Sequence, residues 1–261
     1  MPANKKCNSK TTYHGLTLLV DPYFVPKGGS GCFQIAPKPE MRKIKNPICE
    51  LPIPINEIVE GIDAVVITHT HGDHWDEYAA KNIPKTVPIF VQNQSDKDLV
   101  KSQGFKDVTI VGNETPFRGI TITKNEGKHG TDDVIKHFGK GFGICMGFIL
   151  RAPEERTIYF TGDTIWTKNF ETAIEKYDPD YIVMNAALPL YDWMEGSSTM
   201  GQEDIKKCCD MYKKPKVIAT HLDSMVHCVC TSETIRKFVL KNNISDRVLI
   251  PKDGEICILN N

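Results

Sequence analysis

The chain lacks the features that mark several classes of protein. No apolar run approaches the ~18 residues that a membrane-spanning helix needs, and the first residues lack the apolar core of a secretory signal. The formal net charge of -1 gives no general attraction to nucleic acid or to an anionic membrane. We therefore expect a cytoplasmic protein without a membrane span. Nucleic acid is not favoured as a partner.

The composition is ordinary for a globular enzyme, and the pattern predicts an α/β fold. Of 261 residues, 40% are hydrophobic and 25% are charged. Apolar runs of strand length alternate with helical patterns, without repeats or low-complexity tracts. We expect a single domain over residues 1–261, with residues 1–12 possible as a frayed edge because they are polar and poor in strand-forming residues. Strands are predicted at 62–67, 87–92, 106–111, 119–123, 141–150, 156–161, 181–184, 216–219, 248–250 and 256–259, and helices at 95–102, 169–177, 202–212 and from Ser232, its predicted N-cap.

Nine cysteines are scattered along the chain, and the pair Cys208–Cys209 is adjacent in sequence. Neighbouring cysteines bridge one another poorly, and Cys228-x-Cys230 has no second pair with which to build a zinc ribbon. We interpret the cysteines as reduced and mostly buried thiols. As an alternative, Cys228 and Cys230 could line a site, because they follow His227.

Residues 68–74 read Thr-His-Thr-His-Gly-Asp-His and directly follow a predicted buried strand. Because side chains alternate along an extended chain, His69 and His71 point the same way. The turn that follows directs Asp73 and His74 toward a second point. Surface histidines at a strand end are the alternative explanation, but four donors aimed at two adjacent points suit a pair of divalent cations. The segment therefore predicts a metal site.

Three further donors each follow a short predicted strand. His129 stands in a glycine-flanked turn, Asp163 in the sequence Thr-Gly-Asp-Thr, and His221 in Thr-His-Leu-Asp. Taken singly, each is weak evidence, since a Gly-Asp pair is usually just a turn. In this order behind the first motif, they supply the ligands that a dinuclear site still needs.

With these residues the sequence resembles the metallo-β-lactamase fold superfamily of metal-dependent hydrolases, from Leu16 onward. The Leu-Val-Asp-Pro sequence at 19–22 and the His-Trp-Asp sequence at 74–76 resemble most the branch of ascorbate-6-phosphate lactonases and N-acylphosphatidylethanolamine phospholipases D. The resemblance implies a four-layer αββα sandwich. It also implies one metal on His69, His71 and His129, a second on Asp73, His74 and His221, and Asp163 bridging both.

The implied chemistry is hydrolysis. Two divalent cations ~3.5–4 Å apart lower the pKa of a shared water toward ~7 and so supply hydroxide at neutral pH. Asp73, as a ligand of the second metal, helps to orient that hydroxide, and His227 is our candidate for the acid that protonates the leaving group. We expect zinc or manganese, with iron less favoured. We expect a small ester-type substrate, a lactone or a phosphodiester. Trp75, Trp166 and Trp193 could wall the pocket, although ordinary packing explains them equally well.

Other functions use the same kind of metal core. A nuclease is the main alternative, although we find no basic and aromatic patch. A di-iron redox protein is less favoured, because the di-iron members of the superfamily have a carboxylate at the position of His71. A non-catalytic metal-binding protein is disfavoured because no ligand position is lost. The long Pro- and Gly-rich segment 22–54 is interpreted as an active-site lid or a subunit contact, and a homo-oligomer is an open alternative.

Overall fold

The computed structural model describes residues 9–259, apart from the side chain of Lys140. The described elements follow one another in the order β1 (Ser9–Tyr13), β2 (Leu16–Val20), β3 (Gly31–Cys32), η1 (Met41–Lys43), β4 (Lys45–Asn46), α1 (Ile55–Val59), β5 (Ala64–Val66), α2 (Glu77–Asn82), β6 (Ile89–Val91), α3 (Gln94–Ser102), β7 (Val108–Ile110), β8 (Thr115–Phe117), β9 (Ile120–Gly127), α4 (Asp132–Phe138), η2 (Gly139–Gly141), β10 (Cys145–Arg151), β11 (Ile158–Phe160), α5 (Lys168–Tyr177), β12 (Tyr181–Asn185), α6 (Gln202–Met211), β13 (Lys216–Thr220), α7 (Ser232–Lys241) and β14 (Val248–Leu249).

Two main sheets form the centre of the molecule. One has the strand order β1-β2-β5-β6-β7, and the other has the order β14-β13-β12-β11-β10-β9-β8. Strands β2, β5, β6 and β7 are parallel, and so are β11 to β14. The central parallel strands β5, β6, β11 and β12 are buried on both faces, which explains why they read as continuous apolar runs rather than as alternating patterns.

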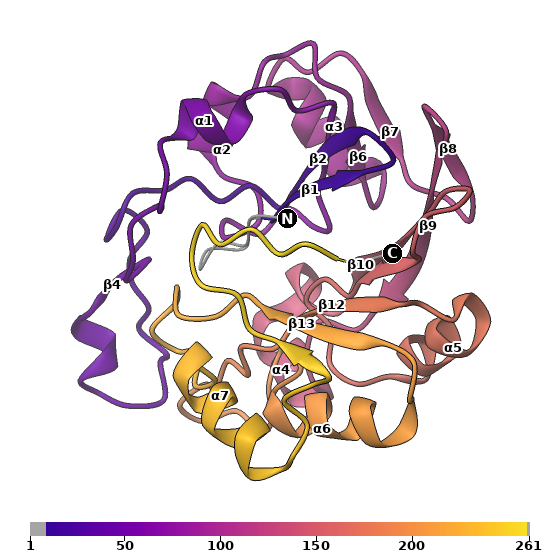
Figure 1. The fold of residues 1–261 in the computed structure, drawn as a ribbon. Coiled ribbons are helices and arrows are strands. Elements are labelled where there is room, and N and C mark those ends of the chain that lie inside the picture. The colour runs from indigo at the N-terminus through magenta and orange to yellow at the C-terminus, as the bar shows by residue number, and fades with distance from the viewer. Residues whose placement is uncertain (1–8, 260–261) are drawn as a thin grey trace.

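The two sheets pack face to face, and helices cover both outer faces. Side chains of β2, β5 and β6 meet those of β9, β10 and β11 in one buried cluster between the sheets. The outer face of the first sheet packs against α1, α2 and α3, which lie together at the top of Figure 1. The molecule therefore has the predicted four-layer αββα sandwich.

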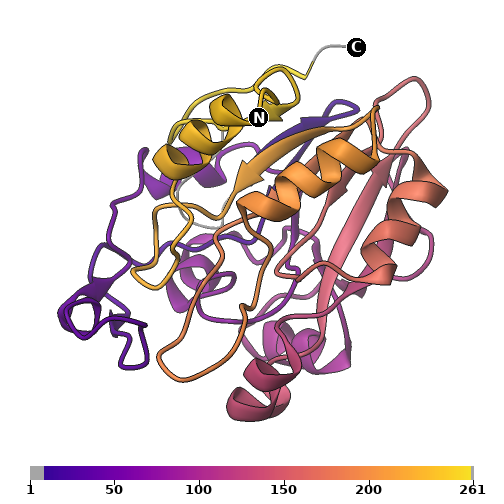
Figure 2. The same cartoon turned by 90° about the horizontal axis from the view of Figure 1, so that it is seen from below.

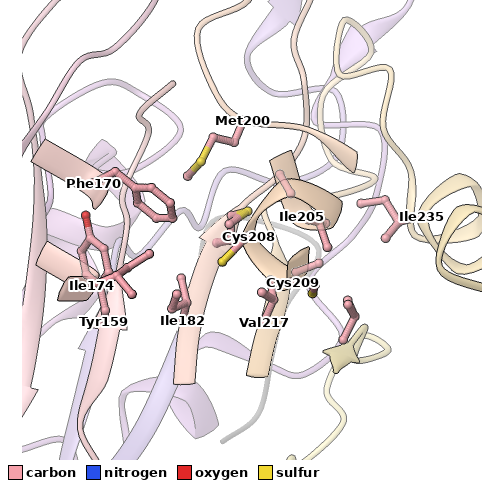
Figure 3. Close-up of a cluster of buried hydrophobic side chains, with 14 of the residues drawn as sticks. Tyr159, Phe170, Ile174, Ile182, Met200, Ile205, Cys208, Cys209, Val217 and Ile235 are labelled. Carbon is pink, nitrogen blue, oxygen red and sulfur yellow. The ribbon is translucent and has the colours of Figure 1, made fainter. Parts of the chain in front are cut away.

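The outer face of the second sheet packs against α5, α6 and α7, which lie side by side over it in Figure 2. In Figure 3, Tyr159, Ile182 and Val217 point from the strands toward Phe170, Ile205 and Cys208. Cys208 and Cys209 are both free thiols within this packing, as the interpretation of the cysteines required. Within residues 9–259, no helix is long and apolar enough to cross a membrane.

The N-terminal edge differs from the prediction of a frayed segment through residue 12. Residues 9–12 belong to β1, which pairs antiparallel with β2 from Ser9–Val20 to Tyr13–Leu16. Ser9, Thr11 and Tyr13 are buried and alternate with more exposed neighbours. The period of two was present in the sequence, but two of the three inward side chains are polar and conceal it. Residues 1–8 lie outside the described part of the chain.

Several smaller predictions were also wrong. Residues 256–259 do not form a strand, and Ile256 and Ile258 are largely exposed. Helices α1, α2 and α4 were not predicted because each is only 5 to 7 residues long, too short to show a periodic apolar face. Segment 22–54 carries the short pair β3–β4 and the single turn η1. Helix α7 is capped by Thr231, and Ser232 is its first helical residue.

We expect Thr231→Ala to lower the free energy of unfolding by about 1 kcal/mol. The Thr231 hydroxyl accepts a hydrogen bond from the backbone N–H of Thr234 at 3.1 Å, and the Thr234 hydroxyl accepts one from the Thr231 N–H at 2.8 Å. Denaturant unfolding measures the change. Thr231→Ser keeps the acceptor and should behave like the wild type. A larger loss from Ser232→Ala than from Thr231→Ala would contradict this assignment of the cap.

Candidate metal centre and its pocket

The predicted donors converge because each follows a strand of one of the two packed sheets. His69, His71, Asp73 and His74 lie between β5 and α2, where the backbone N–H groups of His74 and Trp75 both bond to the His71 carbonyl at 2.9 Å. This turn brings donors that are near in sequence to two different points. The remaining three, His129, Asp163 and His221, follow β9, β11 and β13.

Three imidazoles form the first group of donors. The Nδ1 atom of His71 lies 3.0 Å from Nε2 of His69 and 3.1 Å from Nε2 of His129. Ligands bound tetrahedrally at a typical Zn–N distance of about 2.0–2.1 Å stand roughly 3.3 Å apart. The three nitrogens are therefore arranged as a metal ion requires, and this group could hold one.

The second group contains Asp73, His74 and His221 and could hold another metal ion. The Nε2 atom of His221 lies 3.3 Å from Nε2 of His74 and 3.6 Å from Oδ2 of Asp73. All three side chains aim nitrogen or carboxylate oxygen at a common point. This is the donor chemistry that zinc and manganese accept.

Asp163 lies between the two groups. Its Oδ2 atom is 3.2 Å from Nε2 of His74, 3.5 Å from Nε2 of His221 and 3.9 Å from Nε2 of His129. The preceding Gly162 has a φ of 61°, and a Cβ added there would lie 2.5 Å from the Met146 carbonyl oxygen. Only glycine fits that turn, which is how the Gly-Asp pair places the carboxylate between the histidines.

A second layer of hydrogen bonds fixes the orientation of the donors. Asp21, at a φ of 47°, accepts from the N–H and the hydroxyl of Thr68 at 2.7 and 2.8 Å and lies 3.0 Å from Nδ1 of His74. A carboxylate behind a ligating histidine fixes its ring and its tautomer. From the sequence, Asp21 was noted only within the Leu-Val-Asp-Pro motif that carries the family resemblance, and no role was predicted for it. An Asp-Pro pair directly after an apolar strand was the available signal.

The other donors are supported in the same way. His71 Nε2 lies 2.7 Å from the Gly141 carbonyl, and His129 Nδ1 lies 3.0 Å from the Ser198 carbonyl. Asn185 donates to Oδ1 of Asp163 at 2.7 Å, which leaves Oδ2 facing the histidines. Sequence reasoning missed these partners because backbone carbonyls and a lone asparagine carry no pattern.

Burial and mutual charge set the protonation of the cluster. Burial lowers the pKa of His69 well below its ordinary value and that of His129 to about 4, so both imidazoles are neutral at pH 7. Burial alone would raise the pKa of Asp163, but the nearby His221 and His74 outweigh it and hold the pKa well below the ordinary value. Neutral imidazoles and ionised carboxylates are the forms that bind metal.

The cluster opens into a pocket of about 290 Å³. Its walls are mostly apolar and aromatic, and no lysine or arginine is among the lining side chains that the structure describes. His227 and Cys228 line it, as the sequence suggested for both, whereas Cys230 does not. None of the three tryptophans lines it: Trp75 packs in the core, Trp166 packs beside α5, and Trp193 is 58% exposed. Ordinary packing therefore explains Trp75 and Trp166, and Trp193 stands at the surface.

Fold and site together define a metallo-β-lactamase-type protein, and the comparisons agree. Residues 17–222 match the model of the Beta-lactamase superfamily domain. The UPF0173 protein YddR of Bacillus subtilis is 33% identical over 247 residues, 93% of each chain. The UPF0173 metal-dependent hydrolase MJ1163 of Methanocaldococcus jannaschii is 26% identical over 230 residues, 87% of this chain and 96% of its own.

Two solved structures are also similar over nearly the whole chain. A possible metal-dependent hydrolase of Veillonella parvula is 37% identical with a TM-score of 0.90, over 96% of this chain and 95% of its own. An isothiocyanate hydrolase from Delia radicum gut bacteria is 32% identical with a TM-score of 0.91, over 97% of each chain. The chain belongs to the Beta-lactamase superfamily and, within it, to the UPF0173 family of metal-dependent hydrolases. The predicted class of metal-dependent hydrolase is thereby confirmed.

Proposed function

We propose that this protein holds two divalent metal ions, zinc or manganese, and uses them to hydrolyse a small uncharged substrate. His69, His71 and His129 would bind one ion, Asp73, His74 and His221 the other, and Asp163 both. The donor separations of 3.0 to 3.9 Å support this assignment. A cytoplasmic location and a homo-oligomeric state stay predictions from the sequence.

The bound ions would supply a hydroxide nucleophile at neutral pH and polarise the bond under attack. The chain itself contributes the geometry. Asp21 and Asn185 hold the rings and the carboxylate at fixed angles, and Asp73 and Asp163 keep negative charge at the centre. The mostly apolar walls lower the local dielectric constant, which strengthens electrostatic interactions inside the pocket.

The chemistry of the side chains that line the pocket supports an uncharged substrate. Phosphodiesters and nucleic acids bring negative charge that proteins usually pair with lysine or arginine, and none is among the described lining side chains. A lactone is neutral and fits better than a phosphodiester. The similarity to the isothiocyanate hydrolase supports another neutral electrophile, an isothiocyanate with an apolar substituent. Its hydrolysis adds the oxygen of water to the carbon of the N=C=S group and breaks the C=N bond of that group. The nitrogen leaves as an amine with both protons of the water, and the carbon leaves as carbonyl sulfide.

A substrate panel tests this proposal directly. Protein reconstituted with zinc or manganese is assayed with benzyl isothiocyanate, dihydrocoumarin as a lactone, and bis(para-nitrophenyl) phosphate. We expect the isothiocyanate to be hydrolysed with the highest kcat/KM and chelation to abolish turnover. A phosphodiesterase activity exceeding both others would overturn the choice of a neutral substrate.

We expect Asp163→Asn to remove the shared charge while preserving the shape of the side chain. Metal affinity should fall by more than about a hundredfold, the upper range for losing a residue that only supports a ligand. Metal content by elemental analysis and kcat/KM should fall together. Asp107→Asn, at an exposed position, is the matched control and should change neither. Two full equivalents of metal and normal turnover in Asp163→Asn would sink the bridging role.

We propose that His227, predicted from the sequence as the acid, donates a hydrogen bond to the leaving nitrogen while that nitrogen takes up the protons of the water. Its ring lines the pocket, and burial lowers its pKa to about 4, so at pH 7 it acts as a neutral N–H donor. His227→Ala should keep its metal content but lose about tenfold in kcat, because a hydrogen bond to a group that develops charge contributes about 1.5 kcal/mol. His227→Gln retains an N–H donor and should lose less. An unchanged kcat in His227→Ala would reduce the residue to a wall of the pocket.

A further inference from the structure

Segment 22–54, here called the strap, forms part of the pocket wall. Its middle part, with β3, η1 and β4, lies on the left in Figures 1 and 2, while Phe24, Leu51 and Ile53 near its ends pack with the helices of the first sheet. Tyr23, Ser30 and Phe33 from the strap line the same pocket as His71 and Asp73. Phe33 is half-buried, and its ring stacks on His227 with centroids 4.2 Å apart and an angle of 27° between the planes. The strap therefore places an aromatic face opposite the metal centre.

The strap is fastened to the loops that carry the rest of the wall. The Arg42 guanidinium lies 2.6 Å from the Asp192 carboxylate and also donates to the Ala36 carbonyl at 2.9 Å. The Asp192 N–H donates to the Ile35 carbonyl at 3.0 Å, two residues from Phe33. Further along, the Asn46 side chain accepts from the Val226 N–H at 2.9 Å, next to His227. Phe33 and His227 are thus held in register by contacts on both sides.

Aromatic rings continue from Phe33 around the pocket to the metal donors. Tyr191 lies 5.8 Å from His227 and 5.1 Å from Phe138 between ring centroids. Phe138 stacks on Phe142 at 4.3 Å, and Phe142 lies 4.5 Å from the His129 ring. These rings come from the strap, from residues 129–142, which include helix α4, and from the loops that follow β12 and β13, and all line the pocket. A flat ring placed among them can stack or meet their edges, which a saturated ring cannot do equally well.

We propose that Phe33 determines specificity for a substrate that carries an aromatic substituent, and that the Arg42–Asp192 pair is the positioning contact that keeps Phe33 in place. The inference rests on the proposed hydrolysis of a neutral electrophile at this site. It adds the chemical nature of the substituent and the residues that select it. The aryl group of the substrate lies against Phe33 and the neighbouring rings, while the electrophilic carbon of the substrate faces the metal donors.

The test uses two substrates that differ only in the aromaticity of one ring, benzyl and cyclohexylmethyl isothiocyanate. We expect wild-type kcat/KM to favour the benzyl compound about fivefold, from the usual strength of ring–ring contacts. Phe33→Ala and Phe33→Leu should bring this ratio close to one. Ile44→Ala, an exposed strap position, is the matched control and should keep it. Because it is a ratio, it does not depend on metal loading or on the folded fraction.

Binding of neutral probes separates this inference from the proposed function. Benzyl alcohol and cyclohexylmethanol are titrated into the metal-loaded protein by calorimetry or NMR, without any turnover. Preference for the benzyl probe that disappears in Phe33→Leu supports the role of Phe33, even if isothiocyanates are not substrates. Equal binding of the two probes by the wild type, or an unchanged preference in Phe33→Leu, overturns it.

The same ratio of kcat/KM values for the benzyl and cyclohexylmethyl compounds tests the positioning role of the Arg42–Asp192 pair. Arg42→Ala should lower the preference for the benzyl compound toward that of Phe33→Ala, and Arg42→Lys should restore part of it by keeping the charge near Asp192. A loss of total activity with the preference unchanged would show that the pair only stabilises the fold. In that case the positioning role is wrong.

Discussion

The site depends on the placement of ionised carboxylates among buried imidazoles. Oδ2 of Asp163 lies within 4 Å of ring nitrogens from three histidines on three different loops. Its pKa and that of Asp73 are held below their ordinary values, while burial keeps His69 and His129 neutral. Unpaired negative charge in a protein interior is costly. Divalent cations would offset the remaining negative charge at the point where the donors converge, which supports the proposal that this cluster holds the metal.

Much of this arrangement could be predicted because the two packed sheets produce a simple pattern in the sequence, an apolar strand followed by a metal donor. Strands β5, β11 and β13 are buried on both faces and therefore read as apolar runs, and each is followed at once by a donor. Once the sheets pack together, their strand ends lie near one another. The Gly162–Asp163 pair shows the same logic at a single residue, since the close approach to Met146 allows no side chain.

The features that escaped prediction depend on contacts between segments far apart in the chain. Asp21 orients His74 across 53 positions of sequence, and the Ser198 carbonyl that supports His129 leaves no trace in the residue type. Strand β1 was obscured because Ser9 and Thr11 point inward. Ser232 and Thr231 are both good capping residues. Only the hydrogen bond that the Thr231 hydroxyl accepts from the Thr234 N–H shows which of them caps the N-terminus of α7.

Metal binding and substrate choice are carried by different parts of the molecule. The donors stand at the ends of strands in the rigid sandwich, where packing on both faces limits movement. The rings that line the pocket stand on the strap, on residues 129–142 and on the loops that follow β12 and β13. Arg42, Asp192 and Asn46 join the strap to these two loops. Loops can change without disturbing the core. The identity of the wall residues can therefore change while the metal donors stay in place, and this separation is the basis for the proposed preference for a neutral aryl substrate.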